Sequence, residues 1–221
     1  MNMISIYIRK VDNVWYGFAF TGEKILATTI CSTREKSAKS LISEIPFNVD
    51  HRIIEEGSEF TEKTIMMLKK LNSGDEEGKS FSLATEYMPE PNAKVLTASA
   101  AIPIGYVTSY GDIAKAADTE AQTVGKIMAT NPLYPIVPCH RVVGTDFSLV
   151  GYGGRKDTSA LKAKLARLEK EAKGFTAEKE LSINGRKLIV YPVERVIERV
   201  EKQEFTQCRQ RRLFDCVRSD S

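Results

Sequence analysis

The sequence predicts an α/β N-terminal domain followed by a mainly α-helical domain that contains a helix-turn-helix. Three observations support this fold class: short strand-like segments separated by turn residues at the start of the chain, the prolines Pro89 and Pro91, and two short capped helices beyond them. The chain has 221 residues and 42% hydrophobic content, which is enough for one or two modest cores, and its composition does not indicate disorder.

Three short strands are expected to open the chain. Asp12-Asn13 and Gly22 between them are residues that favour tight turns. The expected strands are residues 4–8, 14–20 and 24–30. A small antiparallel sheet therefore begins the N-terminal domain.

Two helices follow in the N-terminal domain. Residues 32–45 have helical spacing after Ser and Thr caps, and residues 58–71 have it before a polar, glycine-containing stop. Residues 81–85 form a further expected strand. We assign residues 1–88 to this domain, and an alanine-rich helix at 93–101 opens the next one.

Two capped helices with a tight turn between them predict a helix-turn-helix. Ser109 can cap the first helix with Asp112 three residues later, and a turn is expected at Asp118. Thr119 can cap the second helix, with Gln122 at the reciprocal capping position. This arrangement is typical of DNA-binding proteins.

Small residues recur every four positions on the second of these helices, at Ala121, Gly125 and Ala129. Residues four apart share one helix face, so this face carries almost no side-chain bulk. It can approach a nucleic-acid backbone or groove closely, or it can pack against another helix. Spacing alone leaves both interpretations open.

Cys139 and His140 place a thiol beside an imidazole in the segment Pro138-Cys139-His140-Arg141-Val142-Val143. A free thiol has a pKa of about 8.5 and is mostly protonated at neutral pH, so a nucleophilic cysteine needs a base nearby. Adjacent residues on an extended chain point to opposite faces, and we therefore expect a bridging water between the two side chains. The plain alternative is an ordinary buried cysteine.

The remaining cysteines and histidines do not predict a metal site. The four cysteines and two histidines show no paired zinc spacing: they are Cys31, Cys139, Cys208, Cys216, His51 and His140. No signal peptide or membrane span is evident, so we expect an intracellular protein, in the cytoplasm or with the DNA of a nucleoid or nucleus, with free thiols. A net charge of +3 is too small to identify a nucleic-acid binder by itself.

The segment Pro-Cys-His-Arg-Val-Val resembles the active-site signature of the methylated-DNA--protein-cysteine methyltransferase family, the O6-alkylguanine-DNA alkyltransferases. The resemblance extends from about Ile102 to Glu169. It includes Ile102-Pro103, Gly105, Thr108-Ser109-Tyr110, Asn131-Pro132, Gly151-Tyr152, Gly153-Gly154, and the helix positions Lys162, Leu165 and Glu169. It implies that residues 89–173 form a winged-helix-like alkyltransferase domain.

The resemblance also implies a mechanism. Cys139 would take an alkyl group, such as methyl, from oxygen 6 of a flipped-out guanine, and from oxygen 4 of thymine as a second substrate, in a single turnover. His140 would act as the base through water, with Glu169 orienting its imidazolium. Tyr110 would donate to the guanine ring, and Asn131 would brace the active-site segment.

Further roles follow from the same resemblance. The implied DNA-binding residues are Gln122, Ala121, Thr123, Gly125 and Arg141, and the implied substrate-pocket residues are Val142, Tyr152 and Gly153. The chain departs from the family at Gln122, where an arginine usually stands, and at Gly153, where serine often stands. The loop at 152–162 is about three residues longer than in the family.

Residues 174–221 lie beyond the resemblance. Residues 180–191 predict a hairpin around Asn184-Gly185, and residues 193–217 predict a helix. That helix ends in a basic cluster, which is either a phosphate contact or a solvated face: Arg209, Arg211 and Arg212. The role of this extension is open, and it can serve a further partner or a fused domain.

The expected partner is double-stranded DNA that carries an alkylated guanine, bound by a monomer without a cofactor, a metal or a membrane. Two alternatives remain. One is a protein that recognises alkylated DNA without transfer, although such relatives typically lack the cysteine that is present here at Cys139. The other is a helix-turn-helix regulator in which the cysteine senses electrophiles and a defined DNA sequence is bound.

Overall fold

A four-stranded sheet forms the N-terminal half of the chain in the computed structural model, which describes residues 3–74, 82–183 and 185–203. Its strands are β1 (Ile4–Val11), β2 (Val14–Thr21), β3 (Lys24–Cys31) and β4 (His51–Ile54), in the order β3-β2-β1-β4. The first three are antiparallel, as predicted, whereas β4 pairs parallel with β1 and was not predicted. Asp12 and Asn13 both have positive φ angles, of 49° and 64°, which fits a tight hairpin turn.

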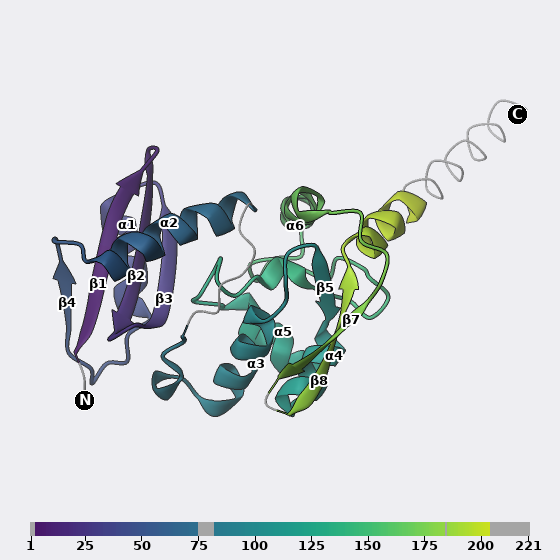
Figure 1. Cartoon of the computed structure of the whole chain (residues 1–221), viewed down its shortest axis with the longest axis horizontal. Coiled ribbons are helices and arrows are strands. Elements are labelled where there is room, and N and C mark those ends of the chain that lie inside the picture. Colours follow the sequence, from purple (N-terminus) through teal and green to yellow (C-terminus); the bar gives the residue numbers. More distant parts are fainter. Residues whose placement is uncertain (1–2, 75–81, 184, 204–221) are drawn as a thin grey trace, which may run out of the picture.

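Helices cover both faces of this sheet (Figure 1). The helix α1 (Arg34–Ser43) buries Leu41 in a cluster that contains Ala19, whereas α2 (Glu59–Ser73) packs in a cluster that contains Phe18. Successive residues of a strand point to opposite faces, so the two helices lie on opposite sides of β2. The expected caps are present: Thr33 accepts from the Lys36 amide at the start of α1, and Gly74 ends α2 with a φ of 81°. The Ser58 side chain also accepts from the Thr61 amide at the start of α2.

The C-terminal half contains α3 (Glu90–Ala100), α4 (Tyr110–Ala117), α5 (Ala121–Ala129) and α6 (Thr158–Glu171), with short 3-10 turns at Thr85–Tyr87 and Cys139–Arg141. Ser109 caps α4 by accepting from the Asp112 amide at 2.9 Å, and Asp118 forms the turn with a φ of 58°. The expected cap of α5 is corrected, because Glu120 rather than Thr119 precedes the helix and makes no side-chain cap hydrogen bond. The two helices and their tight turn agree with the prediction.

A second sheet joins distant parts of the chain. Its order is β6-β5-β8-β7, formed by β5 (Tyr106–Ser109), β6 (Val142–Val143), β7 (Lys179–Ile183) and β8 (Arg186–Pro192). The strand β5 pairs parallel with β6 and antiparallel with β8. The hairpin predicted at 180–191 is therefore present as β7 and β8, and β7 forms one edge of the sheet. The strand β6, which directly follows the Cys139 segment, forms the other edge.

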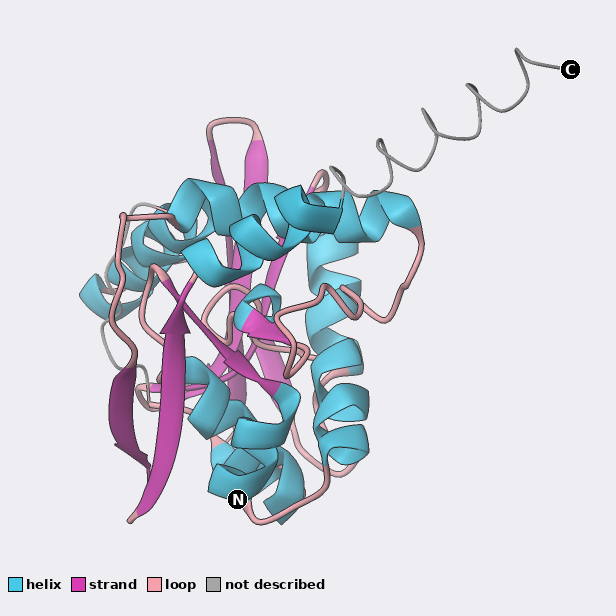
Figure 2. Cartoon of the chain, turned by 90° about the vertical axis from the view of Figure 1, so that its right-hand side faces the viewer, coloured by secondary structure: helices cyan, strands magenta, loops and turns pink. Residues whose placement is uncertain are grey.

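The two sheets lie toward opposite ends of the molecule, with α3 and α5 between them (Figure 1). Helices pack against both sheets, as the view turned by 90° shows (Figure 2). One apolar cluster runs from Phe18 and Ile65 in the N-terminal half to Val124, Ile136 and Leu188 in the C-terminal half. The halves thus share buried apolar surface.

One expected strand is absent, and one expected helix runs beyond the residues that the structure describes. Residues 82–85 do not form a strand of their own: Leu83 makes an isolated bridge to Ile25, and a 3-10 turn begins at Thr85. Residues 194–203 are helical, but the rest of the helix predicted at 193–217 lies outside the described residues, together with Cys208, Cys216 and the three clustered arginines. Within the described ranges, no helix is long and apolar enough to cross a bilayer.

Gly105 offers a test of the packing between β5 and the extension. Its φ is +82°, and an added Cβ would lie 2.7 Å from a ring carbon of Phe175, which itself stacks on Tyr106. We expect Gly105→Ala to lower the free energy of unfolding by about 1–3 kcal/mol, measured by urea denaturation. Gly125→Ala is the matched control, because a Cβ added there would meet no atom within 4 Å and a helical alanine stabilises by about 0.5–1 kcal/mol. Equal stability of Gly105→Ala and the wild type would contradict this account.

Candidate active site

Cys139 follows a loop that is held by its own side chains. Asn131 donates from Nδ2 to the Val137 carbonyl at 2.8 Å, and its Oδ1 accepts from the Leu133 amide at 3.0 Å. Burial raises the pKa of the Cys139 thiol, and the nearby Asn131 side chain opposes this effect. The segment from 131 to 139 is therefore a compact turn that places the half-buried thiol at its end.

His140 is buried beside a carboxylate at the end of α6. Its Nε2 lies 2.8 Å from Oε1 of Glu171, and the two residues are 3% and 2% exposed. The expected partner Glu169 is exposed instead. Two residues correspond to about 200° around a helix, so Glu169 and Glu171 lie on opposite sides of α6, and the assignment of Glu169 as the histidine's partner is wrong.

Arg141 completes this buried network. Its Nε and Nη2 donate to the two oxygens of Glu171 at 2.7 and 2.8 Å, and its Nη1 donates to the Ile102 carbonyl at 2.6 Å. The side chain is buried, with the residue only 6% exposed. The prediction that Arg141 contacts DNA is therefore wrong, because its guanidinium is buried and hydrogen bonded to Glu171 and to the Ile102 carbonyl.

The network sets the protonation states of its members. Burial alone would raise the pKa of Glu171, but hydrogen bonds from His140 and Arg141 outweigh it and lower the pKa to about 2. Burial lowers the pKa of His140, so its imidazole is neutral at neutral pH. Nε2 faces a carboxylate and thus carries the ring proton, which leaves Nδ1 as an acceptor.

The acceptor nitrogen of His140 has no protein partner. Among the described residues, three buried side-chain atoms lack a hydrogen-bond partner: Ser37 Oγ, His140 Nδ1 and Glu194 Oε2. A buried unpaired nitrogen is costly unless water or a reacting group satisfies it. Nδ1 of His140 is therefore available to take a proton through a water molecule.

The thiol of Cys139 is protonated in the resting protein. Burial raises its pKa, and this effect outweighs the hydrogen bond from Asn131 and the positive charges of Lys164 and Arg167, which lower it. A protonated thiol is a poor nucleophile, so chemistry at Cys139 needs a base at the moment of reaction.

Lys164 is a site residue that the sequence analysis missed. It is 0% exposed, and its Nζ donates to the carbonyls of Val142 at 2.6 Å and Gly151 at 3.0 Å. Burial lowers its pKa to about 8. Lys162, one of the helix positions in the family resemblance, is exposed instead. Val142, which was expected to line the substrate pocket, has its carbonyl bonded to Lys164.

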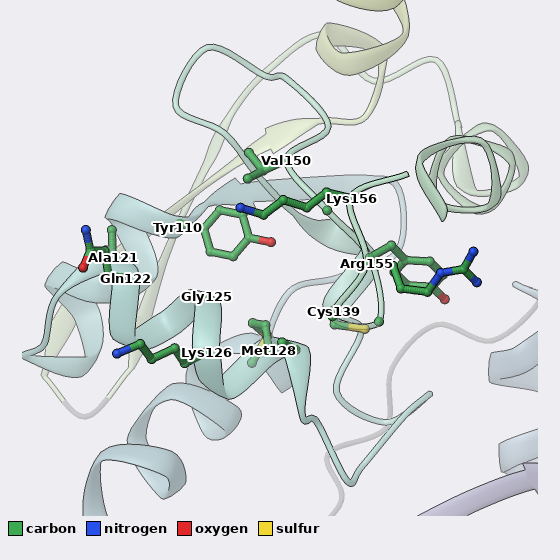
Figure 3. Close-up of a pocket in the computed structure, with 15 residues that line it drawn as sticks. Tyr110, Ala121, Gln122, Gly125, Lys126, Met128, Cys139, Val150, Arg155 and Lys156 are labelled. Carbon is green, nitrogen blue, oxygen red and sulfur yellow. The ribbon is translucent and has the colours of Figure 1, made fainter. Parts of the chain in front are cut away.

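A pocket of about 620 Å³ opens over Cys139. Figure 3 shows α5 on one side of it and the loop with Val150, Arg155 and Lys156 on the other, with Cys139 between them. The lining residues on the helices are Tyr110, Ala121, Gln122, Gly125, Lys126, Met128 and Ala129, and those on the loop are Val150, Gly151, Tyr152, Gly153, Gly154, Arg155 and Lys156. Most expected DNA-binding and pocket residues thus surround one cavity.

The small-residue stripe of α5 faces this pocket. Ala121, Gly125 and Ala129 all line it, and no atom lies within 4 Å of a Cβ placed on Gly125. Thr123 and Val142 are not among the lining residues, and Val142 is fully buried. The stripe is therefore open to a ligand, which favours close approach of a partner over packing against another helix.

Tyr110 remains a proton donor in this pocket. Burial, with a smaller contribution from Cys139 once its thiol ionises at high pH, raises the pKa of Tyr110 to about 12. Its phenol therefore stays protonated at neutral pH. Within the described residues, no group of three or more His, Cys, Asp or Glu side chains is placed to hold a metal ion.

Comparisons with known proteins agree with this geometry. Residues 90–173 match the family model described as "6-O-methylguanine DNA methyltransferase, DNA binding domain". The chain is 30% identical over 148 residues to the methylated-DNA--protein-cysteine methyltransferase of Methanocaldococcus jannaschii, covering 66% of this chain and 83% of that protein. It is 57% identical over 53 residues to the enzyme of the same name from Pyrobaculum aerophilum, covering 24% of this chain and 36% of that protein.

A solved structure has a similar fold. The O6-methylguanine-DNA methyltransferase of the hyperthermophilic archaeon Pyrococcus kodakaraensis strain KOD1 superposes with a TM-score of 0.52 at 27% identity, covering 76% of this chain and 99% of that one. Similarity to the M. jannaschii protein extends over most of that relative's length, and the family match at 90–173 includes the segment of Cys139 and His140. The chain therefore belongs to the methylated-DNA--protein-cysteine methyltransferase family.

Proposed function

We propose that this protein repairs DNA by transferring an alkyl group, in the simplest case methyl, from oxygen 6 of guanine to Cys139 in a single turnover. Oxygen 4 of thymine is a second candidate substrate. The observation that supports the proposal best is the half-buried thiol of Cys139 at the base of an open pocket, next to a buried histidine whose Nδ1 is unpaired. The family to which the chain belongs supports the same reaction.

The proposed chemistry needs only protein groups and water. The thiol proton of Cys139 passes through water to Nδ1 of His140, and Glu171 stabilises the imidazolium that results. The sulfur attacks the alkyl carbon as the bond from carbon to the guanine oxygen breaks. Tyr110 gives its proton to the guanine ring as negative charge develops there and regains one from water, and the His140 imidazolium returns its proton to water, so the guanine stays in the DNA without the alkyl group and no net proton is gained or lost.

The product accounts for a single turnover. A thioether on Cys139 joins sulfur to carbon, and thiol exchange does not reverse it because no disulfide is present. The protein is therefore consumed as it acts.

DNA is the partner that fits the pocket. We propose that α4 and α5 act as a helix-turn-helix and that the hairpin β7–β8 gives the domain its winged-helix-like form. The stripe of Ala121, Gly125 and Ala129 would allow the backbone of α5 to approach the minor groove, and Gln122 would occupy the space of the extruded nucleotide. Exposed Lys126 is placed for phosphate contacts.

Incubation with duplex DNA that contains one O6-methylguanine tests the proposal directly. We expect the intact mass of the protein to increase by one methylene per chain, and Cys139→Ala to show no increase while it still binds the lesion. Lesion-dependent binding without a mass change would indicate recognition without transfer. Binding that depends on DNA sequence and not on the lesion would favour an electrophile-sensing regulator.

Glu171 and Glu169 form a matched pair for the second prediction. Glu171→Gln removes the charge that stabilises the imidazolium of His140, and we expect the transfer rate on folded protein to fall by about 10²-fold or more. Glu169→Gln changes an exposed carboxylate and is expected to leave the rate unchanged. Single-turnover kinetics under conditions where circular dichroism shows folded protein would measure both. The assignment of Glu171 would be wrong if only Glu169→Gln slowed transfer.

The pH dependence of transfer follows from the lowered pKa of His140. A lowered pKa keeps the imidazole in its neutral, basic form to a lower pH than an ordinary histidine, whose pKa is about 6.5. The raised pKa of Cys139 keeps the thiol protonated over the same range. At saturating DNA we expect a rate that is constant from about pH 8 to about 6.5 and falls only below that value. A rate that already declines above pH 7 would contradict the assignment of a buried neutral base.

A further inference from the structure

The outer edge of β3 is joined to the loop that carries the active-site cysteine. The backbone amide of Thr28 donates to the Pro132 carbonyl at 2.8 Å. Its side-chain Oγ1 donates to the Tyr134 carbonyl at 2.7 Å. Thr28 is buried, so water does not compete for these two bonds. A residue of the N-terminal sheet thus fixes the backbone 106 positions further along the chain.

The loop held by Thr28 is the one that places both reacting side chains. The Val137 amide donates to the Leu133 carbonyl at 2.9 Å, and Asn131 donates to the Val137 carbonyl, so hydrogen bonds connect the two ends of the loop. The ring of Tyr134 meets the ring of His140 edge-on, with centroids 6.3 Å apart. A shift at Tyr134 would therefore reach both Cys139 and His140.

A second, weaker contact from the N-terminal half converges on the same tyrosine. The hydroxyl of Tyr134 lies 3.5 Å from Oδ1 of Asn72, which is in the last turn of α2. Arg167 lies with its guanidinium 4.9 Å from the centre of the Tyr134 ring and donates to the carbonyl and to Oδ1 of Asn72, each at 3.4 Å. These distances are at the long end for hydrogen bonds, so Thr28 supplies the stronger anchor.

We propose that the N-terminal sheet helps to position the groups that carry out the transfer. Thr28 is the positioning residue: it fixes the backbone of residues 132–134, and through this backbone it fixes Cys139 and His140. The inference rests on the proposed transfer reaction. The exposed edge of a sheet can be covered by backbone hydrogen bonds alone, and at Thr28 the bond from its amide to the Pro132 carbonyl is such a bond. The additional bond from the Oγ1 hydroxyl to Tyr134 serves the loop rather than the edge.

The test compares three substitutions on one strand. Thr28→Val keeps the shape and the backbone bond to Pro132 but removes the Oγ1 donor, whereas Thr28→Ser retains the donor. Thr29→Val is the matched control, because Thr29 is equally buried and its Oγ1 contacts Cys31 at 3.2 Å rather than the active-site loop. Transfer rates at saturating O6-methylguanine duplex, DNA dissociation constants and melting temperatures are measured for all three and for the wild type.

We expect Thr28→Val to transfer about tenfold more slowly at saturating DNA with an unchanged dissociation constant, because misplacement of reacting groups lowers the rate and not the affinity. Thr28→Ser and Thr29→Val should remain close to the wild-type rate. A wild-type rate in Thr28→Val overturns the inference, and so does equal slowing of Thr28→Val and Thr29→Val, which would indicate a general loss of stability. Absence of transfer by the wild type would overturn the proposed function itself, and the inference with it.

Discussion

The buried carboxylate of Glu171 is the interaction on which the geometry of the site depends. It accepts from His140 Nε2 at 2.8 Å and from Arg141 at 2.7 and 2.8 Å. Placing a carboxylate in the interior costs several kcal/mol unless its oxygens are paired and hydrogen bonded, and here both oxygens are. Through Arg141 the network also reaches the Ile102 carbonyl, just after the end of α3. The end of α6, the turn of Cys139 and the segment before β5 are thereby held in one arrangement.

The rest of the chain supports this arrangement from two sides. The extension contributes β8, which pairs with β5, and β5 in turn pairs with β6 directly after the Cys139 turn. On the other side, Thr28 of the N-terminal sheet bonds the Tyr134 carbonyl in the loop that precedes Cys139. Lys164 joins two further segments, because its ammonium bonds the Val142 carbonyl after the turn and the Gly151 carbonyl in the pocket wall. Segments that are far apart in sequence therefore converge on a single turn.

Local sequence patterns predicted most of the helices and strands and the proposed nucleophile Cys139, but they did not predict the contacts between distant residues. Caps, turns and the Asn184-Gly185 hairpin depend on neighbours in the chain, and the Cys139-His140 pair lies within one motif. The short strand β6 and the contact of Thr28 depend on partners far away in the sequence, and no local signal marks them.

The glutamate that partners His140 was misassigned because a lysine precedes a glutamate by seven residues twice in α6. These pairs are Lys162 with Glu169 and Lys164 with Glu171. The apolar residues Ala160 and Leu168 share the buried helix face with the second pair, so their spacing is the signal that could have identified it. The division of the chain near residue 88 stays a prediction.

The resting state of Cys139 follows from the same burial that forms the site. A low thiol pKa would make the cysteine reactive toward any small electrophile, but burial here raises the pKa in spite of Lys164 and Arg167 nearby. In the proposed reaction each protein acts once, so every adventitious alkylation or oxidation of the thiol would remove one molecule from use. A thiol that stays protonated until a substrate places its alkyl carbon beside sulfur and His140 can accept the proton avoids that loss. Burial of the imidazole, which lowers the pKa of His140, keeps the base ready at the same pH.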